Sequence, residues 1–315
     1  MSDIKKLSFS GKDWIDVRPH DWSPDEKTIL FAYYGGNDGG ANYKRYLGII
    51  DVETQIIEEL KVPDDLVEDL FRALFSRSGE EIYLLTNNNI YLYDLKTSKT
   101  QQLTRDIIVS FFGIEDNGDV IYSIEKWDEK SSKYNYPIVR TDAIGNNPKE
   151  IILPETDFPY FDLSYYGEKI LFTKISPDGY IPEFMIYDPQ IPELYTIPIE
   201  NISCGSPPKI DSTSNFVIFH SASCSKGPIG GTLTITDLNG NSEILVPYTN
   251  ENPSYFSISP DDSRMFFGSG NNTISVITFV KPIPEFGSLA IIILTISLVS
   301  IIAYQKKISF RRSLL

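Results

Sequence analysis

Short apolar segments separated by turn-forming residues fill most of this chain. Thr28–Tyr33 and Tyr46–Ile50 are two such segments, rich in β-branched and aromatic residues, with a glycine-rich stretch at 35–40 between them. The preceding Ser23-Pro24-Asp25 suits a tight turn, because proline pre-sets φ and the short polar side chains bond back to the backbone. The pattern predicts a meander of short strands over residues 21–54. Such a unit needs copies of itself to bury both of its faces.

The chain contains those copies. The turn recurs, with weaker matches, at 75–79, 115–118, 163–167, 211–214 and 258–262. A strand that ends in aspartate recurs at intervals of 43 to 49 residues, at Asp51, Asp94, Asp142, Asp188 and Asp237. Six units of roughly 45 residues therefore lie between about residue 20 and residue 280, and this period is typical of a four-stranded propeller blade.

The pattern predicts an all-β protein, a six-bladed β-propeller over residues 1–280. The last unit ends at about residue 277, one strand short, while Lys5–Phe9 precedes the first turn with nothing of its own to pair with. We expect this N-terminal strand to close the last blade, which removes two exposed sheet edges. Residues 64–71 are the best candidate for a short helix.

These residues resemble the TolB-like propeller repeat, whose blades carry a Ser-Pro-Asp-Gly turn before a strand and an aspartate after the next. The resemblance covers about residues 7–280 and is closest in the first and last units. The third unit lacks Ser-Pro, and Ser176-Pro177-Asp178-Gly179 falls after a strand instead of before one. The resemblance implies a scaffold that binds partners at one face.

An uncharged apolar run follows the repeats. Residues 286–304 carry no charge, and at 1.5 Å per residue they form about 28 Å of helix, enough to span a bilayer. Four basic residues follow the run, at 306, 307, 311 and 312. We therefore predict a single transmembrane helix at 288–304, with a cytoplasmic tail at 305–315 and the propeller on the extracellular side.

The linker at 281–287 contains a second signal. Pro284, Glu285, Phe286 and Gly287 precede the apolar run and the basic end, an order similar to the PEFG-CTERM tail, an archaeal relative of PEP-CTERM sorting signals. The resemblance implies recognition by an archaeosortase-like membrane enzyme, removal of the tail and attachment of the new C-terminus to the envelope. An ordinary stop-transfer anchor is the alternative.

Other features bear on the compartment. Residues 1–14 show no apolar core of a signal peptide, which keeps open a tail-anchored scaffold that faces the cytoplasm. Cys204 and Cys224 flank the turn of the fifth unit, so a hairpin would bring them together as a disulfide; two unpaired thiols are the alternative. Asn201 and Asn271 begin N-glycosylation sequons.

The net charge is −15. So acidic a chain argues against nucleic acid and anionic lipid surfaces as partners. It fits a well-solvated surface, or one that attracts cations or basic partners.

Catalysis finds little support in the sequence. There are two histidines, His20 and His220, and no Gly-x-Ser-x-Gly elbow. Residues 116–119 look a little like a calcium loop but lack its spacing and terminal glutamate, so a β-turn explains them better. We expect no cofactor, no metal site and no enzyme.

The prediction is therefore a membrane- or envelope-anchored extracellular propeller that acts as an interaction module for an unknown protein or small ligand. Its site would lie at the mouth of the central channel, within reach of the loops at 35–43 and 223–231. An extracellular propeller hydrolase or lyase acting at the channel is the alternative.

Overall fold

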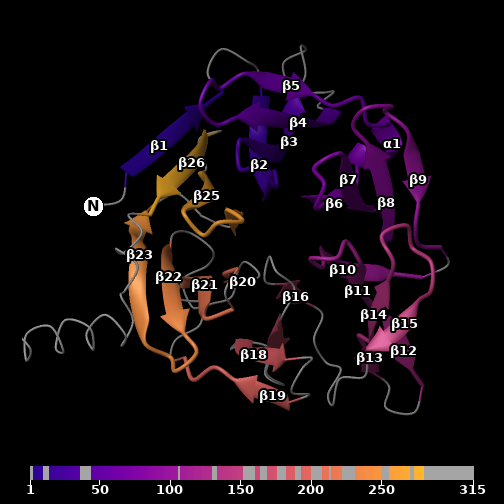
Figure 1. Ribbon diagram of the computed structural model, residues 1–315, viewed down its shortest axis with the longest axis vertical. Coiled ribbons are helices and arrows are strands. Elements are labelled where there is room, and N and C mark those ends of the chain that lie inside the picture. The colour runs from indigo at the N-terminus through magenta and orange to yellow at the C-terminus, as the bar shows by residue number, and fades with distance from the viewer. Residues whose placement is uncertain are drawn as a thin grey trace, which may run out of the picture. The chain divides into compact units, whose positions relative to one another are not determined.

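The described residues form six four-stranded antiparallel sheets, one two-stranded hairpin and one helical turn. The computed structural model describes residues 3–9, 14–35, 44–105, 107–129, 133–151, 160–163, 169–175, 182–188, 193–199, 208–212, 214–221, 231–249, 255–269 and 273–279. Each sheet is one blade, and within Ser2–Thr278 the blades follow one another around a ring (Figure 1). The prediction of a six-bladed, all-β propeller is confirmed.

Each of the first three blades runs from an inner strand outward in chain order. Blade 1 contains β2 (Trp14–Trp22), β3 (Thr28–Gly35), β4 (Lys44–Asp51) and β5 (Ile57–Glu59). Blade 2 contains β6 (Leu70–Phe75), β7 (Glu81–Thr86), β8 (Asn89–Asp94) and β9 (Thr100–Gln102). Blade 3 contains β10 (Val109–Ile114), β11 (Val120–Ile124), β14 (Ile138–Thr141) and β15 (Lys149–Ile151).

The remaining blades repeat this order. Blade 4 contains β16 (Tyr160–Leu163), β17 (Ile170–Ile175), β18 (Pro182–Asp188) and β19 (Glu193–Thr196). Blade 5 contains β20 (Lys209–Ile210), β21 (Phe216–Ser221), β22 (Gly231–Asp237) and β23 (Ser242–Thr249). Blade 6 contains β24 (Phe256–Ile258), β25 (Arg264–Ser269) and β26 (Thr273–Thr278), with β1 (Asp3–Ser8) as its outer strand.

The first strand of the chain and the last strand of the propeller belong to the same sheet. β1 pairs with β26 along its whole length, from Asp3 opposite Thr278 to Ser8 opposite Thr273. Leu7 is fully buried against the first and last blades together with Phe266 and Ile274. The ring is thus closed by main-chain hydrogen bonds between segments about 270 residues apart in sequence.

Two elements differ from the sequence-based expectation. The helix α1 (Asp64–Val67) is a single turn, and residues 70–75, part of which we expected to be helical, form β6. The reason is tertiary: this segment is the inner strand of blade 2, and it pairs with β7 except at Phe71, where the register shifts. Blade 3 also carries an unpredicted hairpin, β12 (Lys126–Asp128) with β13 (Lys133–Asn135).

The recurrent turn joins the first and second strands of a blade. In five blades its fourth residue donates a backbone N–H to the carbonyl of its first; these fourth residues are Glu26, Gly79, Gly118, Ser214 and Asp262. All five have a positive φ, a conformation that glycine adopts at least cost, and two of them are glycine. The tight turn predicted at residues 115–118 is among them, whereas the corresponding turn of blade 4 lies outside the described residues.

The recurrent aspartate ends, or directly follows, the third strand of a blade. The carboxylate of Asp51 accepts the backbone N–H groups of Glu53 and Thr54, and Asp237 accepts those of Asn239 and Asn241 in the same way. The pKa of Asp51 is lowered by its hydrogen bonds from Thr54 and Glu53, and that of Asp237 is lowered first by the side-chain amide of Asn241 and then by the backbone N–H groups. The repeat that defines the sequence is therefore explained by turn formation.

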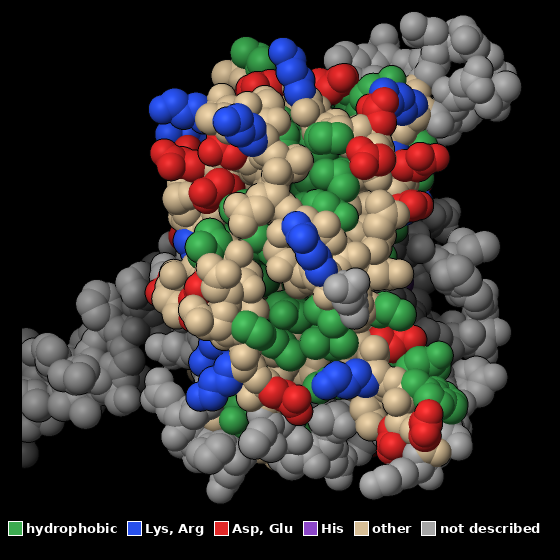
Figure 2. Space-filling view, turned by 90° about the vertical axis from the view of Figure 1, so that its right-hand side faces the viewer, with side chains coloured by type: hydrophobic (Ala, Val, Ile, Leu, Met, Phe, Trp, Pro, Cys, Tyr) green, Lys and Arg blue, Asp and Glu red, His purple; other side chains and the backbone are tan. Residues whose placement is uncertain are grey.

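Exposed side chains on the outer strands are mixed in type. Figure 2 shows the side of the molecule that lies on the right in Figure 1, where acidic and basic side chains are interspersed with apolar ones. Trp127 and Tyr134 of the blade 3 hairpin are 54% and 49% exposed and pack edge to face. This surface therefore shows no gathering of charge of one sign.

Candidate functional site

The inner strands of the blades surround a central channel. β2 contacts β6 on one side and β24 on the other, and β16 contacts both β10 and β20. Two cavities lie along the channel, and both are lined by residues of β2, β6, β10 and β20 and by the segment around β24. Residues that follow one another along an inner strand thus reach different depths of the channel.

The larger cavity lies toward the N-terminal ends of the inner strands and holds about 200 Å³. We call it the wide cavity, and its lining includes Arg18, His20, Arg45, Phe71, Arg72, Lys209 and Tyr255. The narrow cavity, of about 80 Å³, lies toward the C-terminal ends, where the blade turns begin. Its lining includes Asp21, Phe75, Arg77, Ser212 and Asp262. Arg72 and Lys209 line both cavities and so stand between them.

Four basic side chains converge on the wide cavity. We call Arg18, Arg45, Arg72 and Lys209 the cationic cluster; they come from β2, β4, β6 and β20. Among the described residues that line this cavity there is no aspartate or glutamate. The cluster therefore stands out in a chain with 43 acidic and 28 basic residues.

Specific contacts position the arginines of the cluster. Arg45 donates one hydrogen bond of 2.6 Å to the carbonyl of Leu70 and another of 2.5 Å to the hydroxyl of Tyr34. The Arg72 guanidinium lies 4.0 Å from the centre of the Phe111 ring. Arg18 forms an ion pair with Asp16. These contacts limit the rotamers of the arginines and hold their charges at the channel.

A bulge in β6 places Phe71 beside Arg72. The register between β6 and β7 shifts between Leu70 and Arg72, so Phe71 is the extra residue. Phe71 is 57% exposed, although it is a large apolar side chain, and Tyr255 is 38% exposed. The wide cavity therefore offers aromatic surface next to positive charge.

His20 and Asp21 are consecutive residues of β2 that line different cavities. Burial, aided by the positive charges of Arg45 and Arg72, lowers the pKa of His20 to about 3, so its imidazole is neutral at pH 7. Burial raises the pKa of Asp21 to about 6, while the backbone N–H of Phe75 and the nearby Lys209 oppose the shift. Both shifts have the same physical cause, because burial disfavours the charged form of each group.

Hydrogen bonds between neighbouring blades surround the narrow cavity. The Asp21 carboxylate accepts the backbone N–H of Phe75, which ties blade 1 to blade 2 over 3.0 Å. Asp262 accepts the backbone N–H of Ser212 at 3.0 Å and so ties blade 6 to blade 5. Arg77 spans from blade 2 to blade 3 and donates to the carbonyl of Ile114 at 2.6 Å. These polar groups have structural partners in the next blade.

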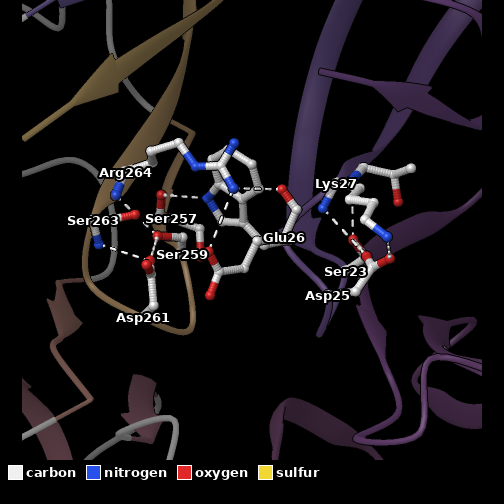
Figure 3. A network of polar contacts seen from close by, with 11 residues as sticks. Ser23, Asp25, Glu26, Lys27, Ser257, Ser259, Asp261, Ser263 and Arg264 are labelled. Carbon is white, nitrogen blue, oxygen red and sulfur yellow. Dashed lines mark hydrogen bonds and ion pairs between the residues drawn. The ribbon is translucent and has the colours of Figure 1, made fainter. Parts of the chain in front are cut away.

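The junction of blades 6 and 1 has the same character. Arg264 donates a hydrogen bond of 2.6 Å to the carbonyl of Glu26 (Figure 3), and its guanidinium lies 4.9 Å from the centre of the Trp22 ring. The indole N–H of Trp22 donates to the carbonyl of Ser257 at 3.2 Å. Within each turn, Ser23 and Ser259 donate to Asp25 and Asp261, so two copies of the repeat lie side by side. At this end of the channel, hydrogen bonds and a cation–π contact hold the first and last blades together.

Of the residues that the sequence singled out, one lines the wide cavity, one is buried elsewhere, and the others lie outside the described residues. His20 lines the wide cavity, whereas His220 lies buried in β21, where burial lowers its pKa. Cys204, Cys224, Asn201, Asn271 and the motif Pro284–Gly287 lie outside the described residues, as does most of the two predicted loops at 35–43 and 223–231. These remain predictions.

The cationic cluster was not predicted. Its four members lie between residues 18 and 209, and only the ring closure brings them together. One signal could have pointed to part of it: Arg18 and Arg72 lie at similar distances before the first turn residues Ser23 and Ser76 of their blades, whereas Lys209 lies closer to the corresponding Asp211.

The described part of the chain lacks two features. No helix there has the length and apolar character needed to cross a membrane. No group of three or more His, Cys, Asp or Glu side chains among those residues is arranged to hold a metal ion.

Comparison with solved structures supports a TolB-like propeller. A TolB of Acinetobacter baumannii superposes with a TM-score of 0.52 at 16% identity, over 84% of this chain and 55% of that protein. A TolB candidate from Agrobacterium tumefaciens gives a TM-score of 0.58 at 14% identity, over 88% and 97% of the two chains. An oligogalacturonate lyase in complex with manganese gives 0.54 at 12% identity, over 89% and 97%. At such identities these likenesses show the fold alone.

Sequence comparison points to peptidases. The family profile for the N-terminal region of dipeptidyl peptidase IV matches residues 23–126. A protein of Sordaria macrospora described as "Probable dipeptidyl-aminopeptidase B" is 31% identical over 152 residues, and one of the same description from Neurospora crassa has the same identity over the same length. The aligned segment is 47% of this chain and 16% of each relative, so this chain spans a small part of the length of those proteins.

The expectation that this protein is not an enzyme is contradicted. The profile match and the two relatives point, at low identity, to a peptidase-like family of propeller enzymes. The expectation rested on two histidines and one missing nucleophile motif. The Gly-x-Ser-x-Gly motif identifies one kind of catalytic centre, so its absence does not exclude other enzymes. Similarity to the relatives over 152 residues is stronger evidence about function than the absence of this motif.

Proposed function

We propose that this protein is a peptidase-like propeller that takes a peptide segment into the wide cavity of its central channel. The observation that carries the proposal is the profile match over residues 23–126. This stretch includes β6 and β10, the inner strands that bring Phe71, Arg72 and Phe111 to the cavity. The proposal concerns binding, and it assigns no described residue to bond cleavage.

The geometry of the wide cavity suits one part of an extended chain. Its volume of about 200 Å³ is below the roughly 300–1,000 Å³ of sites for drug-sized ligands. A peptide end or a single side chain fits such a space, with the rest of the peptide outside it. The exposed ring of Phe71 offers apolar contact area to the bound segment.

Equilibrium dialysis of the full-length protein against a mixture of synthetic peptides, read by mass spectrometry, tests the proposal. We expect retention of a subset of the peptides, and loss of that retention in the Phe71→Ser variant. Trp127→Ser is the matched control, because it removes an aromatic side chain of similar exposure from the outer hairpin of blade 3. Failure to retain any peptide at millimolar concentration, or equal loss in both variants, contradicts the proposal. The same spectra report any shortened peptides.

We also propose that residues 288–304 anchor the protein in a membrane, with the propeller on the extracellular side and residues 305–315 in the cytoplasm. The uncharged run and the basic residues after it support this orientation. Pro284-Glu285-Phe286-Gly287 would direct processing by an archaeosortase-like enzyme. Intact-mass analysis of the protein from an archaeal host tests the processing: cleavage beside the motif with an added mass supports it, and a chain that still ends at Leu315 contradicts it.

A further inference from the structure

We propose that a groove between blades 2 and 3 binds the basic side chain of a peptide whose neighbouring part occupies the wide cavity. The inference rests on the proposed function, because it names the class of side chain that the bound peptide carries. We call this space the junction groove. It holds about 520 Å³, within the roughly 300–1,000 Å³ that is typical of ligand sites.

The two walls of the junction groove are joined to each other. Blade 2 contributes residues at the start of β6 and the turn after β7, and blade 3 contributes the start of β10 and residues that flank β11 and β14. The backbone N–H of Val109 donates to the carbonyl of Asn88 at 2.9 Å, and both residues line the groove. The space is therefore formed before a peptide arrives, and binding requires little ordering of the protein.

Charge is the first argument. Asp69 of blade 2 and Glu125 of blade 3 line the groove, and its described lining contains no lysine or arginine. Neither carboxylate has a hydrogen-bond or ion-pair partner among the described residues. Both are thus open to a cation from a ligand, and charge-assisted hydrogen bonds between a carboxylate and an ammonium or guanidinium group are among the strong ones.

The apolar part of the lining is the second argument. Phe71 and Ile108 are 57% and 45% exposed, and they line the groove from the two different blades. Lysine and arginine have aliphatic stems that pack on apolar surface while the charged end stays with polar partners. The face of an aromatic ring also attracts a cation. The groove therefore offers contacts to both parts of a basic side chain.

An unpaired hydroxyl is the third argument. Thr86 lines the groove and is 1% exposed, and its buried Oγ1 has no hydrogen-bond partner among the described residues. Buried polar atoms are nearly always paired, so an unpaired one at a cavity marks a place where a further partner can add a hydrogen bond. This hydroxyl can donate to a carbonyl of a bound peptide or accept one of its N–H groups.

Phe71 connects the junction groove with the wide cavity, because it lines both. Among the described lining residues of the two spaces, aspartate and glutamate occur only in the junction groove. One extended peptide can therefore place a residue in each space, with its basic residue in the junction groove.

Isothermal titration calorimetry on the full-length protein tests the inference with the peptides N-acetyl-Ala-Ala-Xaa-Ala-Ala-amide. Lysine or arginine at the central position supplies the basic side chain, norleucine supplies a stem without the charge, and glutamate reverses the charge. A further norleucine peptide with a free amino terminus places the cation on the main chain. We expect at least one basic peptide to bind about tenfold more tightly than the acetylated norleucine peptide, since a hydrogen bond to a charged group is worth about one to two powers of ten in affinity.

Variants locate the effect. The double variant Asp69→Asn/Glu125→Gln should reduce the preference for the basic peptide to about twofold or less, while the norleucine peptide binds as before. Each single variant should lower the preference in part, so the test does not depend on folding of the double variant. Glu58→Gln is the matched control: it removes the same charge from an exposed residue of β5 that lines none of the three spaces, and the preference should stay. Raising the salt concentration should weaken the basic peptide selectively.

The outcomes separate the inference from the proposed function. Equal binding of the basic and norleucine peptides by the wild type overturns the inference and leaves peptide binding in place. Failure of every peptide to bind at millimolar concentration overturns both. A preference that survives the double variant moves the basic side chain away from the junction groove and overturns the inference. Tighter binding of the peptide with a free amino terminus than of either basic peptide assigns the cation to the main chain and also overturns it.

Discussion

The two ends of the central channel are built from the same inner strands and yet differ in what their polar groups do. At the C-terminal ends, Asp21, Arg77 and Asp262 bond to backbone groups of the next blade. At the N-terminal ends, Arg18, Arg45 and Arg72 gather around a cavity of about 200 Å³, with Phe71 exposed beside them. The first end joins blade to blade; the second, where Arg45 also bonds to Leu70 of blade 2, presents charge and aromatic surface as well. A repeat protein can therefore keep its structural and binding groups at opposite ends of one set of strands.

The largest expected effect on stability is at the C-terminal ends of the inner strands, where neighbouring blades are bonded to each other; we call this the fastened end of the channel. Trp22→Ala should lower the free energy of unfolding by about 3–5 kcal/mol, because Trp22 is 2% exposed, packs against Phe266 and hydrogen-bonds to Ser257. Trp127→Ala, at a tryptophan that is 54% exposed, should cost about 1 kcal/mol or less. Chemical denaturation measures both values. Equal losses would show that the contacts at the junction of blades 6 and 1 contribute no more to the free energy of unfolding than an exposed side chain does.

His20 and Asp21 should give opposite pH dependences of stability. The folded-state pKa of His20 lies below its ordinary value, at about 3, so the unfolded chain binds more protons and stability falls as the pH drops below about 6.5. The folded-state pKa of Asp21 is raised to about 6, so the folded chain binds more protons and stability rises as the pH falls from 6 toward 4. The two contributions oppose each other between pH 4 and 6.

Single variants separate these contributions. Relative to the wild type, His20→Asn should become more stable on acidification from pH 6 to pH 4, and Asp21→Asn should become less stable, each by up to about 1.4 kcal/mol per pH unit. Asn at position 21 keeps an oxygen acceptor for the N–H of Phe75. Urea denaturation at pH 4.5, 5.5 and 6.5 measures the slopes. If the free energy of unfolding of both variants changed with pH as that of the wild type does, His20 and Asp21 would not have opposite effects on stability.

Arg264 offers a smaller test of the fastened end. Arg264→Lys keeps the charge but loses the planar guanidinium that lies over Trp22 and donates to the carbonyl of Glu26. We expect a loss of about 1–2 kcal/mol in the free energy of unfolding, with peptide affinity unchanged. A drop in affinity without a drop in stability would mean that the two ends are not separate in function.

The smallest expected change in stability is at the binding end. Arg18→Gln should alter the free energy of unfolding by about 0.5 kcal/mol or less, since its ion pair with Asp16 is partly exposed to solvent. The same variant should weaken binding of a peptide that the wild type retains. Thermal unfolding and calorimetry on one preparation give both numbers. A large loss of stability would place Arg18 with the structural groups.

The fold was largely readable from the sequence because its turns obey local chemistry. Ser23-Pro24-Asp25 and Asp51 recur at a blade-sized period, and the structure shows them as turn-forming groups with hydrogen bonds inside their own blade. Such local signals need no knowledge of the ring. The segment at 70–75 was missed in part because its strand conformation depends on pairing with β7, which outweighs local propensity.

The candidate site could not be read in the same way. Arg18, Arg72 and Lys209 belong to three blades, and their meeting depends on the ring closed by the pairing of β1 with β26. Composition was misleading here, because an acidic total suggested attraction of cations, while the charge that lines the wide cavity is positive. The net charge of a chain does not show where its less numerous charges, here the positive ones, lie in the fold.

Photo-crosslinking tests most directly whether ligand enters the channel at the wide cavity. p-Benzoylphenylalanine is placed at Phe71 in one preparation of the full-length protein and at Trp127 in another, and each is irradiated with an isotope-labelled peptide that the wild type retains in dialysis. Both positions are exposed aromatic residues, at 57% and 54%. We predict peptide attached at position 71, reduced by excess unlabelled peptide, and none above background at position 127. Equal labelling at the two positions, or labelling at 127 alone, would contradict the central claim.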